Sequence, residues 1–338
     1  MMPAPESVRR VAIFSGGELL GDGLFKLPFI RSLMATFPNA EIIWVSAGAS
    51  VYAGVLKDLA APYLSRVIEN AGVGRSPREL LAPRRIATGP IDILIDTQTV
   101  AWRSLVVRKT LKPALFVTSA ANYLFSGVTP RQVNPEWTRT KPTHFVDRLM
   151  RLLALASGGR AVADPAATAI PGKYTELAAR LLPDGERYAG FAPGSGDPTK
   201  RWPLDRFIAL ARQAGASGCR PVFFIGPGER FMLDDIRNGV PDALFPEDEA
   251  PDGAPKGPLL VAALGRRLAA AVANDSGLGH MLAISDIPLI LLYGRHAPAK
   301  YAPLTPRLTT FWARDFGGPE HERIPLQKVS AAFRETLG

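Results

Sequence analysis

Residues 273–280, Ala-Asn-Asp-Ser-Gly-Leu-Gly-His, combine the polar and small residues that a phosphate site requires. They follow an apolar run, residues 268–272, that is typical of a buried strand, and they precede a short helical segment at 281–284. A strand that ends here and continues as a helix leaves backbone N–H groups unpaired, and these groups attract phosphate oxygens together with the helix dipole. We therefore predict an anion site formed by Asp275, Ser276, Gly277 and His280.

A second loop of small residues follows the predicted strand at 188–192. Ser195 and Gly196 would let backbone and hydroxyl groups approach a phosphate closely. Lys200 would then supply positive charge where a diphosphate leaving group becomes more negative. The loop does not match the Walker A pattern. An ordinary turn therefore stays open as the alternative to a phosphate site.

Asp22 lies in a Gly-Asp-Gly turn between the first predicted strand, residues 11–14, and the first predicted helix, residues 24–37. Ligands of open α/β sheets bind at such turns. Two interpretations stay open: Asp22 caps the helix, or its carboxylate projects toward a ligand as a general base. The glycines do not form Gly-x-Gly-x-x-Gly, so the dinucleotide-binding fingerprint of a dehydrogenase is absent.

Glu229 and His280 each have two interpretations. Glu229 follows the predicted strand at 221–225, where its carboxylate either accepts hydrogen bonds from ribose hydroxyls or stabilises a helix N-terminus. His280 alone would more often be a structural histidine than a ligand contact. No metal site is expected, because His144, His296 and His321 have no spacing to His280 that suggests one.

Length and composition indicate a globular protein of two domains. The 338 residues suit two domains of about 150 residues each. No apolar run reaches the roughly 18 residues that span a bilayer, and the first six residues lack the pattern of a secretory signal. The single Cys219 excludes an intramolecular disulfide. We therefore expect a cytoplasmic protein.

The positive charge is concentrated in the first half of the chain. Residues 1–170 contain 20 Lys and Arg against 12 Asp and Glu, which accounts for +8 of the formal net charge of +9. This excess either is a solvated surface or provides a face for an anionic acceptor or an anionic membrane surface. No nucleic-acid-binding motif accompanies it, so we expect no nucleic-acid partner. The basic residues include Arg75, Arg78, Arg84, Arg85, Arg103, Arg108, Lys109 and Lys112.

The predicted elements alternate between strands and helices along both halves. This order with short loops favours parallel, doubly wound sheets. We predict an α/β fold of two Rossmann-like domains facing each other across a cleft. In the first half we expect strands at 11–14, 41–45, 91–96 and 115–117, and helices at 24–37 and 144–156. In the second half we expect strands at 188–192, 221–225, 268–272 and 288–292, helices at 174–182, 204–214, 259–264 and 281–284, and an exposed loop at 246–258.

A segment rich in glycine and proline, residues 158–171, separates the two series of elements. We therefore place an N-terminal domain at residues 1–170 and a C-terminal domain at 171–320. The last residues, 321–338, are predicted to form a helix that packs back on the N-terminal domain.

Taken together, these segments resemble glycosyltransferase family 9, the bacterial lipopolysaccharide heptosyltransferases. The matching motifs occur in the family's order over most of the chain, and Asn-Asp-Ser-Gly-x-x-His at 274–280 is the most specific of them. One departure is residues 15–20, which lack the basic residue that family members often carry after the first strand. The other motifs are Gly21-Asp22, Leu27-Pro28, residues 37–42, Asp96-x-Gln98, His144 with Arg148, Lys200-x-Trp202-Pro203 and Gly226-x-x-Glu229.

The resemblance implies a GT-B fold and an inverting, metal-independent glycosyltransferase without a cofactor. It implies a heptose donor, ADP-heptose, and an acceptor in the lipopolysaccharide core or a related anionic glycolipid, with peripheral contact to the inner membrane. Asp22 would be the catalytic base, and Gln98, His144 and Arg148 would bind the acceptor. Ser195, Gly196, Lys200, Glu229, Asp275, Ser276, Gly277 and His280 would bind the donor.

Two other functions compete with glycosyl transfer. A nucleotide-sugar epimerase or hydrolase on the same fold would consume donor without an acceptor. A non-catalytic protein that binds nucleotide-sugars would not consume donor at all.

Overall fold

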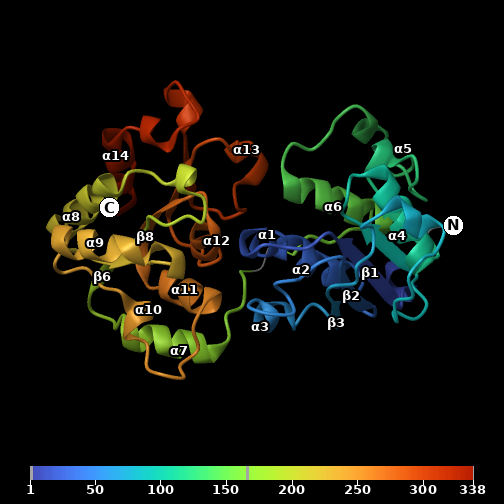
Figure 1. The fold of residues 1–338 in the computed structure, drawn as a ribbon, viewed down its shortest axis with the longest axis horizontal. Helices are drawn as coiled ribbons and strands as arrows, with labels where there is room; N and C mark the ends of the chain where they lie inside the picture. Colours follow the sequence, from blue (N-terminus) through green and yellow to red (C-terminus); the bar gives the residue numbers. More distant parts are fainter. Residues whose placement is uncertain (1–2, 165–166, 338) are drawn as a thin grey trace. The chain divides into compact units, whose positions relative to one another are not determined.

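The computed structural model describes residues 3–164 and 167–337. The chain divides into two compact units between Ala166 and Ala167, close to the boundary predicted after residue 170. Each unit contains one sheet of parallel strands (Figure 1). Within the described residues, no helix is both long enough and apolar enough to cross a membrane.

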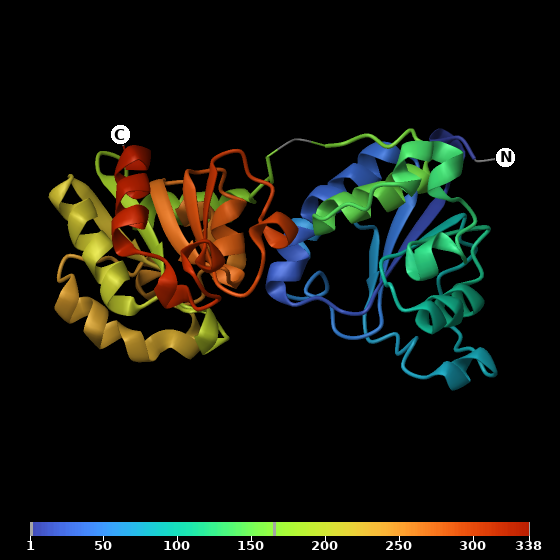
Figure 2. The same cartoon turned by 90° about the horizontal axis from the view of Figure 1, so that it is seen from above.

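The first unit is built on five parallel strands in the order β3-β2-β1-β4-β5. The alternating side chains of β1 face opposite sides of the sheet, and both sides are covered by helices (Figure 2). Ala12 and Phe14 belong to the same buried cluster as Val106 and Val107 of α4. The elements are β1 (Arg10–Ser15), α1 (Leu20–Phe25), α2 (Leu27–Thr36), β2 (Glu41–Ser46), α3 (Lys57–Ala60), β3 (Arg66–Ile68), β4 (Ile93–Asp96), α4 (Ala101–Leu111), β5 (Leu115–Thr118), α5 (Pro130–Val133) and α6 (Phe145–Ala156), with 3₁₀ turns η1 (Pro5–Ser7), η2 (Pro77–Leu80), η3 (Ala120–Tyr123) and η4 (Pro135–Thr138).

The second unit repeats this plan with the strand order β10-β9-β8-β6-β7. Its core lies between the sheet and helices α8 and α14, where Phe191, Phe207 and Phe333 are buried. The elements are α7 (Gly172–Leu181), β6 (Arg187–Ala192), α8 (Leu204–Ala216), β7 (Cys219–Phe223), α9 (Leu233–Gly239), α10 (Pro246–Glu249), α11 (Pro258–Gly265), β8 (Leu268–Asn274), α12 (Gly277–Ala283), β9 (Leu289–Tyr293), α13 (Pro298–Tyr301), β10 (Leu308–Trp312) and α14 (Leu326–Leu337), with η5 (Pro198–Lys200), η6 (Pro227–Met232), η7 (Ala313–Phe316) and η8 (His321–Arg323).

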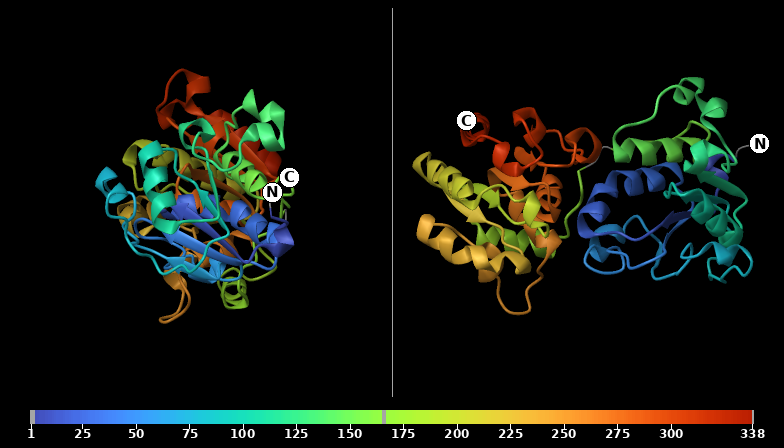
Figure 3. Two further views of the ribbon diagram at one scale, coloured as in Figure 1. Left: turned by 90° about the vertical axis from the view of Figure 1, so that its right-hand side faces the viewer. Right: turned by 45° about the horizontal axis from the view of Figure 1, so that its top comes forward.

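The C-terminal helix packs on the sheet and helices of its own unit. α14 lies beside α8 and β8 (Figure 3), and the predicted packing on the N-terminal domain stays a prediction. It does so through its apolar face, whose Val329, Phe333 and Leu337 are buried in the core of the second unit.

Other differences from the predicted elements are local. The helix expected at 24–37 is two helices, because Pro28 stands in the first turn of α2, where its missing N–H and fixed φ favour a new helix start. Asp22 lies inside α1 rather than in the turn before a helix. The exposed loop expected at 246–258 contains the short helix α10. Strands β3 and β10 and helix α4 were not predicted, because their apolar spacing is weak and much of their surface is exposed.

In each sheet the chain changes direction at one pair of neighbouring strands, β1 beside β4 and β6 beside β8. Ligands of doubly wound sheets bind beyond the carboxyl ends of the strands at such a switch point. The predicted donor loops follow β6 and β8, and the Asp22 segment and Asp96-x-Gln98 follow β1 and β4. The strand order therefore places Asp22, Gln98 and the loops of Lys200 and Asp275 at the two switch points, whereas Glu229 follows the edge strand β7 and His144 with Arg148 lies at the start of α6.

Candidate functional site

The loop after β6 is fastened to the end of β8 by Asn274. This side chain is fully buried: its Oδ1 accepts from the backbone N–H of Trp202 at 3.1 Å, and its Nδ2 donates to the carbonyl of Pro193 at 2.7 Å. Both groups of the amide are therefore satisfied by backbone on either side of the Ser195–Lys200 loop. Asn274 sets where that loop stands relative to Asp275.

Lys200, Asp275 and His296 form one charged cluster in this unit. Oδ2 of Asp275 lies 3.4 Å from the Lys200 ammonium and 2.7 Å from Nδ1 of His296. The Lys200 ammonium also lies 3.2 Å from that ring nitrogen. Lys200 and Asp275 were predicted donor contacts, whereas His296 was noted only for its lack of metal-ligand spacing. Residues from three separate loops thus place two basic groups around one carboxylate.

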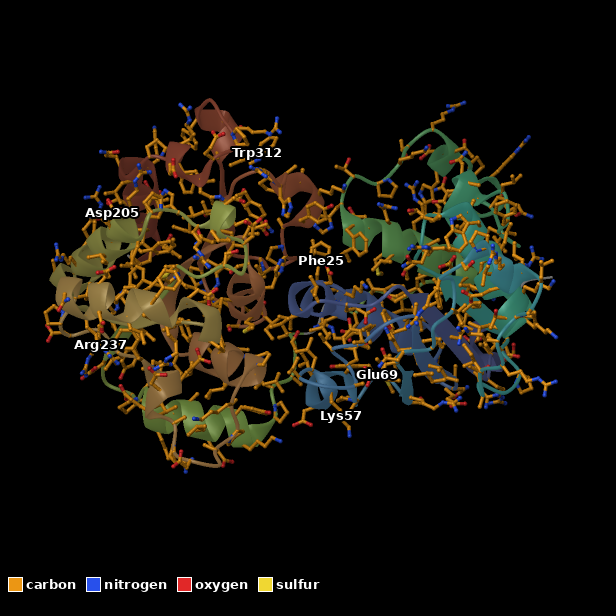
Figure 4. The ribbon with its side chains drawn as sticks, in the orientation of Figure 1. Phe25, Lys57, Glu69, Asp205, Arg237 and Trp312 are labelled. Carbon is orange, nitrogen blue, oxygen red and sulfur yellow. The ribbon has the colours of Figure 1, made fainter. Side chains whose placement is uncertain are left out.

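Contacts of Trp312 and His321 with backbone carbonyls fix the loops that carry this cluster. Trp312, labelled in Figure 4, donates its indole N–H to the carbonyl of Gly294 at 3.0 Å and so fixes the segment that leads to His296. The ring nitrogens of buried His321 lie 3.2 Å from the carbonyls of Thr199 and Leu292, which connects η5 to the end of β9. Burial lowers the pKa of His321, although the two carbonyl contacts act in the opposite direction.

Glu229 is buried beside the same loop. Gly194 and Gly226 leave room for it, because a Cβ at either position would stand 3.0 Å or less from a Glu229 side-chain atom. Arg201 lies 3.9 Å from the Glu229 carboxylate and donates from Nε and Nη2 to the carbonyl of Ser195, at 2.9 and 2.7 Å. Ser195 is buried and Gly196 is exposed, so the loop presents Gly196 outward.

The start of α12 has the tight geometry that its glycines suggest. A Cβ on Gly279 would lie 2.6 Å from the carbonyl oxygen of Asn274 and 2.9 Å from a methyl group of Leu291. Ser276 occupies the N-cap position, but its hydroxyl does not cap the helix. Among the described residues, its buried Oγ has no hydrogen-bond partner. Gly277 begins the helix two residues after Asp275, and His280 is half-buried on the same helix.

In the first unit, Asp22 is exposed on α1, and Leu19 rather than Asp22 is the N-cap of that helix. The interpretation of Asp22 as a helix cap is therefore wrong. α1 packs tightly on the segment after β2: the Tyr52 hydroxyl donates to the carbonyl of Gly23 at 2.8 Å, and a Cβ on Gly23 would lie 2.4 Å from Val51. This packing fixes the helix and leaves the carboxylate of Asp22 facing outward.

Lys26, the C-cap residue of α1, forms a buried ion pair with Glu18. The Lys26 ammonium lies 3.3 Å from Oε1 of Glu18 and 3.2 Å from the hydroxyl of Ser15, and the two charged side chains are only 6% and 0% exposed. Oε1 of Glu18 also accepts from Nε1 of Trp44 at 3.1 Å, and its Oε2 accepts from Ser50 at 2.8 Å. Residues 15–20 contain no basic residue, and the cation beside Glu18 is Lys26, which stands between α1 and α2.

His144 and Arg148 lie at the start of α6. His144 is the N-cap of that helix, and its ring centroid lies 5.3 Å from that of Phe25, which is labelled in Figure 4 and ends α1. The guanidinium of Arg148 lies 6.0 Å from the ring centroid of Phe145. The contacts of His144 and Phe145 with Phe25 bring the start of α6 next to the helix that carries Asp22.

Gln98 lies elsewhere, in a cavity of about 210 Å³ at the carboxyl ends of β1, β2 and β4. Arg75 and Arg103 line the same cavity together with Phe14 and Val73. The lining thus combines apolar residues with two arginines, and arginine is a residue type that suits an anionic ligand. The full lining is Phe14, Gly16, Ala47, Gly48, Val73, Gly74, Arg75, Gln98 and Arg103.

Two carboxyl groups hold this cavity in shape. Glu79 accepts from the backbone N–H groups of Gly74, Arg75 and Ser76 at 2.8–3.0 Å. Its slight burial raises the pKa, but these donors outweigh it and lower the pKa. Asp96 is buried under Gln98, whose backbone N–H it accepts at 2.9 Å, and burial raises its pKa to about 6.

The sequence thus predicted the loops of the candidate site, but not all of the side chains that make contacts there. It missed His296, Asn274 as the fastening residue, and the Glu18–Lys26 pair. It named Arg75 and Arg103 only as part of a basic half. In the part of the chain that the structure describes, no three His, Cys, Asp or Glu residues are grouped as metal ligands.

Comparison with known proteins gives the family. The model of glycosyltransferase family 9 (heptosyltransferase) matches residues 84–328, more than half of the 338 residues. The chain belongs to glycosyltransferase family 9. The matched range includes every predicted donor residue of this family 9 chain and begins after Asp22.

Curated relatives align over part of their length. Lipooligosaccharide heptosyltransferase 2 of Haemophilus influenzae is 34% identical over 149 residues, which are 43% of this chain and 42% of that protein. Lipopolysaccharide heptosyltransferase 2 of Salmonella typhimurium is 33% identical over 124 residues, 34% of this chain and 33% of that protein. The alignments therefore span less than half of these relatives.

Solved structures of low identity confirm the fold. A family 9 glycosyltransferase from Veillonella parvula has a TM-score of 0.69 at 20% identity, with 97% of each chain covered. The Escherichia coli heptosyltransferase WaaC with ADP has a TM-score of 0.68 at 20% identity, with 97% of this chain and 99% of that chain covered. The fold is therefore an α/β GT-B fold, as predicted.

Proposed function

We propose that this chain is an inverting glycosyltransferase that moves heptose from ADP-heptose onto an anionic glycan acceptor of the lipopolysaccharide core. Membership of family 9 supports glycosyl transfer as the reaction class. The observation that carries the assignment of the donor is the cluster of Lys200, Asp275 and His296 at the switch point between β6 and β8. The ADP and ADP-2-deoxy-2-fluoro heptose complexes of WaaC support an ADP-sugar rather than another nucleotide-sugar.

On the donor side, the Lys200 ammonium would contact the diphosphate, and the buried carboxylate of Glu229 would accept hydrogen bonds from the ribose. The Lys200 side chain is 27% exposed, so a ligand can reach it, while Asp275 is only 7% exposed. A carboxylate so placed orients cations more readily than it contacts an anion. Ser195, Gly196, Ser276, Gly277 and His280 complete the proposed donor site.

On the acceptor side, the cavity with Arg75 and Arg103 supports an anionic acceptor. Gln98 lines that cavity, and His144 with Arg148 lies beside the Asp22 helix, so the proposed acceptor contacts occur at two places of the first unit. The predicted peripheral contact with a membrane stays a prediction.

In the proposed reaction, the carboxylate of Asp22 takes the proton of the acceptor hydroxyl as its oxygen forms a bond to the anomeric carbon. The bond from that carbon to the diphosphate breaks on the opposite face, and the electron pair leaves with the diphosphate. Lys200 meets the charge that develops there. Asp22 is exposed and has no role as a helix cap, which is consistent with a free carboxylate.

The first experiment is a thermal-shift screen of nucleotide-sugars. A ligand at 100 times its dissociation constant stabilises the protein by about 2.7 kcal/mol, which gives a measurable shift. We expect ADP-sugars to raise the melting temperature and UDP- and GDP-sugars to leave it unchanged. A protein that responds to none of them does not have the proposed function.

The second experiment tests the role of Asp22. We expect Asp22→Asn to lower turnover by about a hundredfold or more and to leave donor binding unchanged. Asp58→Asn, at an exposed carboxylate on α3 of the same unit, is the matched control. Donor consumption at the same rate without acceptor would indicate a hydrolase or epimerase, and no consumption would indicate a binding protein. Activity in the presence of a chelator tests the proposed metal independence.

A further inference from the structure

We propose that His296 is a further diphosphate contact of the donor site and that binding of a nucleoside diphosphate loads a proton onto its imidazole. The inference rests on the proposed donor site. It goes further by naming a residue that the predicted site did not contain and by giving donor binding a defined dependence on pH.

The contacts of Nδ1 show why His296 belongs to this site. Nδ1 lies 2.7 Å from Oδ2 of Asp275 and 3.2 Å from the Lys200 ammonium, and that ammonium lies 3.4 Å from the same Oδ2. When Nδ1 carries a proton it donates to Asp275 and cannot accept from Lys200. When it carries none it accepts from Lys200 and cannot donate to Asp275. A proton on Nδ1, present in the neutral Nδ1–H tautomer and in the imidazolium, therefore determines which partner Lys200 has.

The charge balance predicts the direction of the change. When His296 is neutral, the positive charge of Lys200 and the negative charge of Asp275 cancel. With protonated His296, the cluster has a charge of +1. A diphosphate adds negative charge beside a carboxylate that is only 7% exposed, and this favours the protonated form of the imidazole. The His296 side chain is 44% exposed, so it can reach a ligand and exchange a proton with water.

Only the imidazolium carries a proton on both ring nitrogens. Nδ1 then donates to Asp275 while Nε2 can donate a hydrogen bond to a phosphate oxygen, a combination that neither neutral tautomer offers. With a proton on Nδ1, the Lys200 ammonium has no acceptor in His296 and can turn toward the ligand. The protonated site therefore offers a phosphate two cationic donors.

Other charged groups surround the cluster and must be separated from His296. Asp197 on the loop before η5 interacts with Lys200 and Arg295. Tyr293 and His321 both interact with Asp275 from the buried side. Tyr301 of α13 packs on the imidazole with ring centroids 5.4 Å apart, and Lys300 lies next to it. Of these groups, His321 is the other imidazole near Asp275, but it is buried between two carbonyls.

The test is calorimetric titration of the full chain with ADP in two buffers of different ionisation enthalpy, which measures protons taken up on binding. The variants are wild type, His296→Gln and Lys300→Gln, the last as a control that removes a neighbouring exposed charge. Proton exchange by ADP itself is common to all three, so differences between variants report on the protein.

We expect wild type and Lys300→Gln to take up a fraction of a proton near pH 7 and His296→Gln to lose this uptake. His296→Gln should weaken ADP about tenfold at pH 6 and about twofold or less at pH 8.5, because a hydrogen bond from a charged donor is lost only where the donor is charged. His296→Arg, a fixed cation, should bind ADP at pH 8.5 more tightly than wild type.

The outcomes separate this inference from the proposed function. If wild type and His296→Gln both bind ADP with the same proton uptake, His296 is not the linked group, although the donor site stands. If no variant binds ADP, the donor site itself is wrong. Melting temperatures of the variants within a few degrees of wild type show that a loss of binding is not a loss of fold.

Discussion

Removal of the Lys26 ammonium should destabilise the N-terminal unit far more than an ordinary surface substitution. Lys26 is the cation of a pair in which the Glu18 carboxylate is 0% exposed. In Lys26→Met the Glu18 charge stays buried without a cation, a situation that costs about 3–5 kcal/mol. Trp44 and Ser50 still donate to Glu18, so the lower end of that range, about 3 kcal/mol, is expected.

Hydrogen exchange measured by mass spectrometry can test this magnitude unit by unit. A loss of about 3 kcal/mol corresponds to roughly a hundredfold faster exchange of amides that open only with the whole unit. We expect this acceleration in peptides from β1 and β2, and no change in peptides from β8 and β9, which serve as the internal control. Equal acceleration in both units, or a change below threefold in β1 and β2, would refute the reasoning.

A double variant separates the ion pair from simple loss of packing. In Lys26→Met with Glu18→Gln no charge is buried, and the new amide can still accept from Trp44 and donate to a serine hydroxyl. We therefore expect most of the stability to return, leaving a deficit of about 1 kcal/mol. If the double variant is as unstable as Lys26→Met alone, the damage comes from lost packing and not from the unpaired charge.

Three further predictions follow from single contacts. The pKa of Asp96 is raised by burial to about 6, so its folded form holds a proton that the unfolded chain releases. At pH 4, protonated Asp96 should contribute up to about 3 kcal/mol to the free energy of unfolding of the N-terminal unit, measured in urea. This contribution should be lost as the pH rises to 6, and Asp96→Asn should abolish this part of the pH dependence. Gly279→Ala should destabilise the C-terminal unit by about 1–3 kcal/mol in urea unfolding, because its Cβ would meet the Asn274 carbonyl oxygen at 2.6 Å, whereas Gly215→Ala, with no atom within 4 Å, should not destabilise. Arg103→Gln should raise the acceptor KM about tenfold and reduce its salt dependence, while the donor KM stays unchanged; an equal rise in both would contradict an acceptor cavity.

The order of elements could be predicted from the sequence because apolar periodicity reports local burial. The strands at 41–45 and 188–192 match β2 and β6 within a residue, and the helix at 144–156 matches α6. The elements that were missed, such as α4, have basic and exposed residues where the periodicity should be apolar. Pro28 was visible, yet the helix break it accompanies was not predicted, because proline in a first turn and proline in a helix interior differ only in context.

By itself, the sequence determined the α/β class, the two-domain plan and the loops that carry the candidate chemistry, since each follows from patterns among residues close together in the chain. The tertiary structure decided which side chains meet. Lys200 and Asp275 are 75 positions apart, and Lys200 and His296 are 96 apart, yet all three converge because β6 lies beside β8 and β8 beside β9. Strand order is fixed by packing of both sheet faces over the whole unit, and no local spacing records it. For the same reason Lys26 could be read as a helical residue, while its burial against Glu18 became visible only in the fold.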